Sequence, residues 1–216
     1  MSGLVKGGTR VKAYFLPRAI AFLIDAILIS LVASLCFRVF PQYTNYTKLN
    51  QQLEESYRSY LNQDITINEY VAQVNDLSYD IAYQEVPYMI IYIALTIGYF
   101  VVFQAKMNGQ TIGKRLMRVR VVSMEKEESV TTNQYLIRAM INQTLFLNLV
   151  DLGMVLFMNK QVYGYVNIIL VITQFIIMIT CLVMVLYRKD ARGLHDLAAN
   201  TKVVMDGAKE LVECKS

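Results

Sequence analysis

Long apolar windows alternate with polar segments along the chain, and four of these windows are long enough to cross a lipid bilayer. A bilayer core requires about 20 apolar residues in a helix that rises about 1.5 Å per residue. The pattern predicts an all-α membrane protein, a four-transmembrane-helix bundle with spans at about 17–40, 86–105, 135–158 and 163–187. The first window is long for a signal peptide and has no small-x-small cleavage site, so we expect it to remain as a span.

The 41–85 segment between the first two spans is polar, with apolar residues at helical spacing. Leu49 and Leu53 fall on one helical face. Thr66 and Glu69 have the spacing of a capping box, in which two side chains bond the backbone at the start of a helix. We therefore predict a helical insertion made of two amphipathic helices, and we favour a role as a lid or spacer over ligand binding.

Two short stretches have the composition of β-strands. They are RVRVVSM, from Arg118 to Met124, and NTKVVM, from Asn200 to Met205. Both are rich in valine, and the first alternates charged with apolar residues before a charged, turn-like run. We predict that they pair into a small β element on the cytoplasmic side of the membrane.

The formal net charge of +4 becomes informative when it is mapped along the chain. Lys and Arg gather before the first span, between the second and third spans and after the fourth, whereas 41–85 has two basic and seven acidic residues. The positive-inside rule then places both termini and the 106–134 segment in the cytoplasm and the insertion outside. We expect a multi-pass protein of the cell membrane, with the lipid bilayer as a partner and with no nucleic-acid partner.

Charged and amide side chains inside the predicted spans indicate a polar interior. A charged residue at the bilayer centre costs about 2.5–3.5 kcal/mol, so Asp25 must face protein, water or a partner. Asn148 and Asp151 share one face of the third span. We therefore regard Asp25, Asp151 and Asn148 as a candidate ion or proton site. Hydrogen bonding between helices is the alternative role for the same residues.

Chemistry of other kinds is not indicated. His195 is the only histidine, and the three cysteines have no metal-ligand or redox spacing. The segment GQTIGKR is one residue short of a phosphate-binding loop, and Arg115 stands where Ser or Thr would coordinate Mg²⁺. Its basic residues are better suited to lipid phosphates. We expect no enzyme, no cofactor and no metal site.

Several segments resemble, in order and spacing, the signature segments of the RDD family of membrane proteins. They are RAIAFLID from Arg18, GQTIGKRLMRVRVV from Gly109, Arg138 at the start of the third span, and GLHDLAANTKVV from Gly193. The family is named for one arginine and two aspartates; the first two match Arg18 and Asp25, and for the second aspartate we favour Asp196 over Asp151. The positions that the resemblance marks are Arg18, Asp25, Gly109, Thr111, Gly113, Lys114, Arg138, His195 and Asp196.

The resemblance implies a single membrane domain over 1–216 in a bacterial cytoplasmic membrane, and it leaves two functions open. The first is transport, including exchange of a monovalent cation for protons, with Asp25 as the titrating acid. Four spans are few for a secondary transporter, so a homodimer is expected in that case. The second is a non-transporting regulator or scaffold that docks another membrane protein. The 41–85 insertion is longer than the connection usual in the family.

The predicted topology places Arg18 and Asp196 at the inner ends of the first and fourth spans. Arg18 and Asp25 are seven residues apart, roughly 10 Å along a helix, which is too far for a direct pair. We predict instead that the 188–200 segment folds back and brings Asp196 to Arg18 as a partly buried ion pair. The alternative is that Arg18 extends to lipid phosphate.

Overall fold

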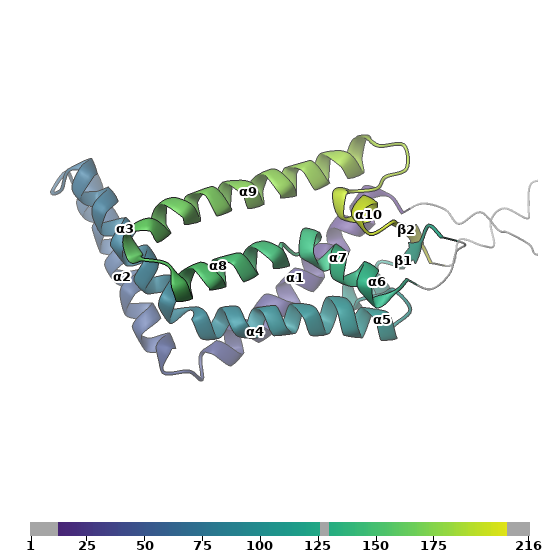
Figure 1. The fold of residues 1–216 in the computed structure, drawn as a ribbon, viewed down its shortest axis with the longest axis horizontal. Helices are drawn as coiled ribbons and strands as arrows, with labels where there is room; N and C mark the ends of the chain where they lie inside the picture. The colour runs from purple at the N-terminus through teal and green to yellow at the C-terminus, as the bar shows by residue number, and fades with distance from the viewer. Residues whose placement is uncertain (1–12, 126–129, 207–216) are drawn as a thin grey trace, which may run out of the picture. The chain divides into compact units, whose positions relative to one another are not determined.

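A computed structural model describes residues 13–125 and 130–206, and most of them are helical (Figure 1). The elements in chain order are α1 (Phe15–Phe37), α2 (Gln42–Leu61), α3 (Ile67–Gln84), α4 (Val86–Ile97), the π-helix η1 (Gly98–Phe103), α5 (Gln104–Lys106), α6 (Ile112–Leu116), β1 (Val119–Ser123), α7 (Thr132–Asn142), α8 (Leu145–Phe157), α9 (Lys160–Tyr187), α10 (Leu194–Ala198) and β2 (Thr201–Met205). The chain forms two compact units. The first comprises the described residues of Met1–Leu28, Ile97–Gln143 and Met178–Ser216, and the second Ile29–Thr96 and Thr144–Ile177.

Three helical segments of the described chain are long and apolar enough to cross a membrane. They are α1, the continuous run Val86–Lys106 that joins α4, η1 and α5, and α9. All three coincide with predicted spans. The expectation of a single helix over 135–158 is wrong, because α7 and α8 meet at a bend of 66°. Counting this bent pair as one span gives four spans in all.

The bend between α7 and α8 has a local cause. Thr144 adopts a left-handed backbone conformation, with φ of 49°, and this interrupts the helical hydrogen-bond ladder. The residues before it, Asn142 and Gln143, are polar and close α7, with the Gln143 amide donating to Ala139. A hydropathy window averages over this interruption and therefore reads the two helices as one.

In the second unit, α2 and α3 pack side by side and form the predicted helical insertion (Figure 1). The rings of Tyr60 and Tyr70 stack with centroids 5.0 Å apart between the two helices. The predicted capping box is confirmed, since Thr66 accepts from the Glu69 amide while the Glu69 side chain accepts from the Thr66 amide. Ala82 of α3 belongs to an apolar cluster with residues of α8 and α9.

In the first unit, β1 and β2 pair antiparallel, with Val121 opposite Val203 (Figure 1). The predicted pairing of the two strands is thereby confirmed. Both valines are buried, and α10 packs against β2 and α7. Ala13, just before α1, donates its amide to the Val203 carbonyl, which ties the start of the first apolar helix to the sheet.

Candidate functional site

Asp25 lies at the centre of a hydrogen-bonded cluster in the first unit. Its side chain on α1 is buried, with 1% of the residue exposed. Its carboxylate accepts hydrogen bonds from the Tyr99 hydroxyl at 2.6 Å, the Thr111 hydroxyl at 2.5 Å and the Gly113 amide at 2.8 Å. The three bonds are short and together satisfy both carboxylate oxygens. The carboxylate therefore connects α1 to η1 and to α6.

The short helix α6 owes its position to two residues of the GQTIGKR segment. Thr111 is its N-cap and accepts from the Lys114 amide at 3.4 Å. Gly113 lies so close to α1 that a Cβ added to it would overlap the Ala21 carbonyl oxygen and lie 2.9 Å from an Asp25 oxygen. Glycine is therefore required here for the close approach of two backbones.

Tyr99 reaches Asp25 from the π-helical turn η1. Its hydroxyl also accepts from the Ile112 amide at 2.9 Å, which satisfies one of the free amides at the start of α6. Single turns of π-helix occur often at functional sites, because the extra residue re-aims the side chains around it. Tyr99 lies within the predicted second span, but the π-turn that directs it to Asp25 has no recognisable pattern in the sequence.

A second buried cluster in the same unit centres on Asp196. Arg18 of α1 pairs with it at 2.5 Å, and Arg138 of α7 pairs with its other carboxylate oxygen. The Asp196 side chain is 0% exposed, against 10% for Arg18 and 8% for Arg138. Arg18 also donates to the Ala191 carbonyl, and Arg138 to the Thr201 hydroxyl at 2.5 Å. The predicted pair between Arg18 and Asp196 is confirmed, and Arg138 makes it a triad.

Burial and the two arginines set the charge states around Asp196. Burial by itself would raise the pKa of Asp196, but the Arg138 and Arg18 guanidiniums outweigh it and hold that pKa well below its ordinary range. Burial lowers the pKa of His195 to about 3, so this imidazole is neutral at physiological pH. Burial, reinforced by the charge of Arg138, lowers the pKa of Lys114 to about 7. The Lys114 ammonium donates to the Gln104 side chain at 3.2 Å.

Asp151 lies in the second unit, and its hydrogen bonds are fewer and longer than those of Asp25. It is half-buried on α8 and accepts from the Tyr163 hydroxyl and the Asn167 side-chain amide, each at 3.2 Å. Asn148, one turn earlier on α8, is also half-buried. Asp151 takes part in none of the ion pairs formed by the described residues.

The predicted site residues therefore divide between the two units. Every position marked by the family resemblance lies in the first unit, whereas Asp151 and Asn148 lie in the second. Gly109 adopts φ of 87° and abuts the Val121 carbonyl, so its place in the motif is a backbone requirement. Sequence reasoning missed Thr201 and Gln104 as partners of Arg138 and Lys114, because both contacts depend on tertiary packing.

In a comparison with known protein families, the model of the RDD family matches residues 12–200. This range contains Asp25 with its three donors and the triad of Arg18, Arg138 and Asp196. Neither a curated protein nor a solved structure matches the chain.

Proposed function

The chain belongs to the RDD family, and we propose that this integral membrane protein exchanges a monovalent cation for protons in a bacterial cell membrane. The proposal rests on one observation. Asp151, on an apolar helix, is a half-buried carboxylate with no cationic partner among the described residues. Such a carboxylate in a poorly solvated place must bind either a proton or a cation to be stabilised.

The surroundings of Asp151 suit this exchange. Both hydrogen bonds, at 3.2 Å, are long: the usual distance is about 2.7–2.8 Å for a hydroxyl donor such as Tyr163 and about 2.9–3.0 Å for an amide donor such as Asn167. A bound cation would therefore displace only weak contacts. The Tyr163 hydroxyl and the Asn167 amide oxygen are ligands of the kind that hard cations prefer. Burial raises the pKa of Glu85 and the Asp151 carboxylate raises it further, although a hydrogen bond with Tyr46 acts the other way. Glu85 is therefore a second acidic residue close enough to interact electrostatically with Asp151.

Asp25 is less suited to exchange than the sequence alone indicates. Three donors between 2.5 and 2.8 Å already satisfy its carboxylate, and a cation would have to replace them. Breaking them would also detach α6 and η1 from α1. We therefore assign Asp25 a structural role and Asp151 the exchanging role.

We further propose four spans, with α7 and α8 crossing together, and cytoplasmic termini. The distribution of basic residues supports this orientation, because the 41–85 insertion is acidic and the connections on the other side are basic. Single cysteines at Asn62 and Lys189, introduced into a cysteine-free background, test it. A membrane-impermeant maleimide should label the Asn62 site in intact cells and the Lys189 site only after lysis. Labelling in the opposite order would refute the orientation.

A second function is supported by Gln174, which is exposed on the membrane-spanning helix α9. Its amide makes one long hydrogen bond, 3.4 Å to the Thr144 hydroxyl. A glutamine that faces lipid is costly and commonly bonds to another helix. A regulator or scaffold that docks a second membrane protein, or a homodimer, would cover this residue.

Flux of Na⁺, K⁺ or Li⁺ into proteoliposomes, driven by a pH gradient, tests the transport proposal. We expect Asp151→Asn to abolish flux while leaving the melting temperature close to that of the wild type. Asp64→Asn is the matched control, because Asp64 is an exposed acid of the insertion, and it should transport normally. Absence of flux in the wild-type protein, together with co-purification of a stoichiometric membrane protein, would favour the docking function instead.

A further inference from the structure

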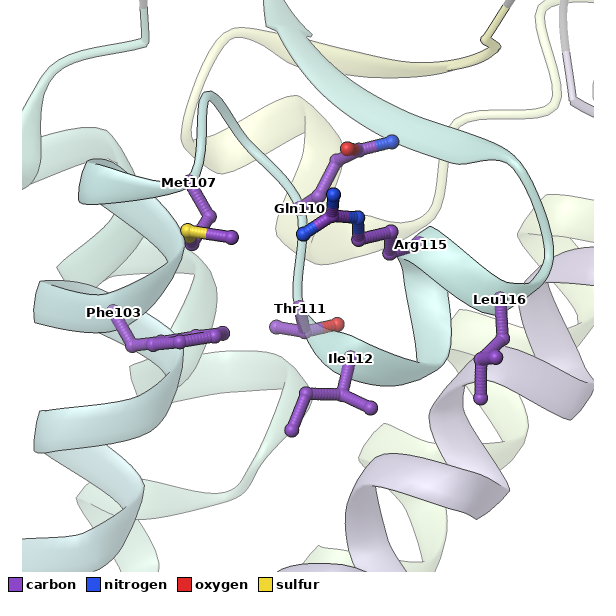
Figure 2. A pocket seen from close by; sticks show the side chains of 7 residues that line it. All are labelled: Phe103, Met107, Gln110, Thr111, Ile112, Arg115 and Leu116. Atoms are coloured by element: carbon purple, nitrogen blue, oxygen red, sulfur yellow. The ribbon is translucent and has the colours of Figure 1, made fainter.

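An apolar pocket lies in the first unit where the Val86–Lys106 helix ends and α6 begins (Figure 2). It has a volume of about 330 Å³ and is lined by Phe103, Met107, Gln110, Thr111, Ile112, Arg115 and Leu116. Ile112 and Leu116 are 40% and 66% exposed, so the pocket opens onto an apolar surface. A pocket of a few hundred cubic ångströms lined by such side chains suits a flexible hydrocarbon ligand.

The border of this pocket is strongly basic. The sequence from Gln104 to Met124 contains five Lys or Arg residues and no Asp or Glu. Arg120 is paired with Asp206 at 2.6 Å, and Asp206 also accepts from Gln110 of the pocket. The Asp206 carboxylate next to the pocket is thus already neutralised.

Three of these five basic residues are exposed and have no ion pair in the part of the chain that the structure describes. They are Lys106, Arg115 and Arg118. Lys114 has no ion pair there either, but it is less exposed and donates to the Gln104 side chain. Figure 2 shows the Arg115 side chain reaching from α6 across the pocket toward Gln110, with Phe103 and Ile112 below it. One pocket therefore combines an apolar floor with an unpaired guanidinium at its border.

From this arrangement we propose that the pocket binds one anionic phospholipid, with an acyl chain among Phe103, Ile112 and Leu116 and the phosphate at Arg115. Charge complementarity selects this occupant. A hydrocarbon ligand without a charged group would leave Arg115 unpaired, and a free phosphate would leave the apolar side chains of the pocket uncovered. The pocket adjoins the end of a spanning helix, which is the depth at which phosphate groups and acyl chains meet. Basic side chains next to such an end attract anionic lipids. The lipid site is independent of ion exchange, since it uses none of the residues around Asp151.

The test uses the full-length protein in a neutral detergent, with lipid binding counted by native mass spectrometry and stability followed by thermal unfolding. The probes are phosphatidylglycerol and phosphatidylcholine with identical chains, and inorganic phosphate. We expect phosphatidylglycerol to bind more tightly than phosphatidylcholine and to raise the melting temperature more. Inorganic phosphate alone should do neither.

Variants separate the two halves of the pocket. Arg115→Gln should weaken phosphatidylglycerol binding roughly five-fold, the factor expected for one basic residue near an anionic surface. It should weaken phosphatidylcholine binding less, because the choline cation already balances the phosphate of that lipid. Ile112→Trp, which fills the pocket without changing the charge, should weaken binding of both lipids. Lys48→Gln removes one positive charge from α2 and serves as the control with wild-type binding. Arg115, Ile112 and Lys48 are all exposed. Without lipid, the melting temperatures of the three variants should therefore match that of the wild type.

Equal binding of both lipids, or equal stabilisation by inorganic phosphate, would overturn the proposal. So would an Arg115→Gln variant that binds phosphatidylglycerol as the wild type does. If Ile112→Trp instead dissociated an oligomer and left lipid binding unchanged, the pocket would be a contact between copies of the chain, and the lipid site would be refuted.

Discussion

Replacing Asp196 by alanine is the most direct test of the buried ionic triad. Asp196 is the only carboxylate paired with Arg18 and with Arg138 among the described residues, and its side chain is 0% exposed. Removing it leaves two nearly buried guanidiniums without a counter-charge. Loss of one partner from a buried pair costs about 3–5 kcal/mol, and two orphaned arginines place Asp196→Ala at the upper end of that range.

The expected loss is large enough to measure as a melting temperature. For a chain of 150–250 residues, 1 kcal/mol corresponds to roughly 2–4 °C, so 3–5 kcal/mol corresponds to a fall of roughly 6–20 °C. Fluorescence-detected thermal unfolding in detergent resolves such a change. The matched control is Glu54→Gln, which breaks a 2.6 Å pair with Arg58 in which both side chains are more than half exposed. An exposed pair of this kind contributes about 0–1 kcal/mol, and the melting temperature should hardly change.

A double-mutant cycle distinguishes pairing from independent roles. Arg18→Ala alone should cost less than Asp196→Ala, because Asp196 keeps Arg138 as its partner. The double variant should cost clearly less than the sum of the two, since Arg18 is no longer present to be orphaned. It should remain below the wild type because Arg138 still lacks its carboxylate. Additive losses would refute the coupling and would favour an Arg18 that interacts with lipid phosphate instead.

Three further predictions concern the residues around these clusters. Gly113→Ala should destabilise the protein by about 1–3 kcal/mol, because the new methyl group overlaps α1. Gly153→Ala is the control: Gly153 lies on α8 with open space around it, so this variant should be neutral or stabilising in the same thermal assay. Tyr99→Phe should cost about 1–3 kcal/mol by removing the hydroxyl that bonds both Asp25 and the Ile112 amide, and an unchanged melting temperature would count against that bridge. Burial lowers the pKa of His195 from 6.5 to about 3, so only the unfolded chain gains its proton as the pH falls below about 6.5. The free energy of unfolding should therefore be roughly 2 kcal/mol lower at pH 5 than at pH 7. Unfolding curves measured over a series of pH values should show a weaker pH dependence in His195→Gln. The same pH dependence in the variant as in the wild type would refute the lowered pKa of His195.

The features that the sequence predicts well are those with a local cause. Hydropathy windows locate α1, the Val86–Lys106 helix and α9, since a bilayer selects for continuous apolar length. Thr66 and Glu69 determine the start of α3 through contacts three residues apart. The pairing of Arg18 with Asp196 follows from charge and topology together, because a buried arginine requires a counter-charge at its own depth.

The features that the sequence misses depend on tertiary context. The left-handed Thr144 that separates α7 from α8 has no signature in a hydropathy window. The π-turn at Gly98–Phe103 changes the direction of Tyr99 by the insertion of one residue, which a 3.6-residue period cannot reveal. The donors around Asp25 come from segments more than 70 positions away along the chain.

The number and length of the donor contacts separate the roles of the two membrane carboxylates more clearly than their depth does. A residue that exchanges ions must give up its partners in each cycle, so every strong hydrogen bond adds to the barrier. Asp25 would lose three bonds of 2.5–2.8 Å and with them the attachment of α6, whereas Asp151 would lose two bonds of 3.2 Å to side chains that can themselves turn toward a cation. The motif position named by the family resemblance is therefore better explained by folding, and the exchange that we propose is better assigned to a residue outside the motif. Flux that survives in Asp151→Asn and is lost in a well-folded Asp25→Asn protein would reverse this assignment.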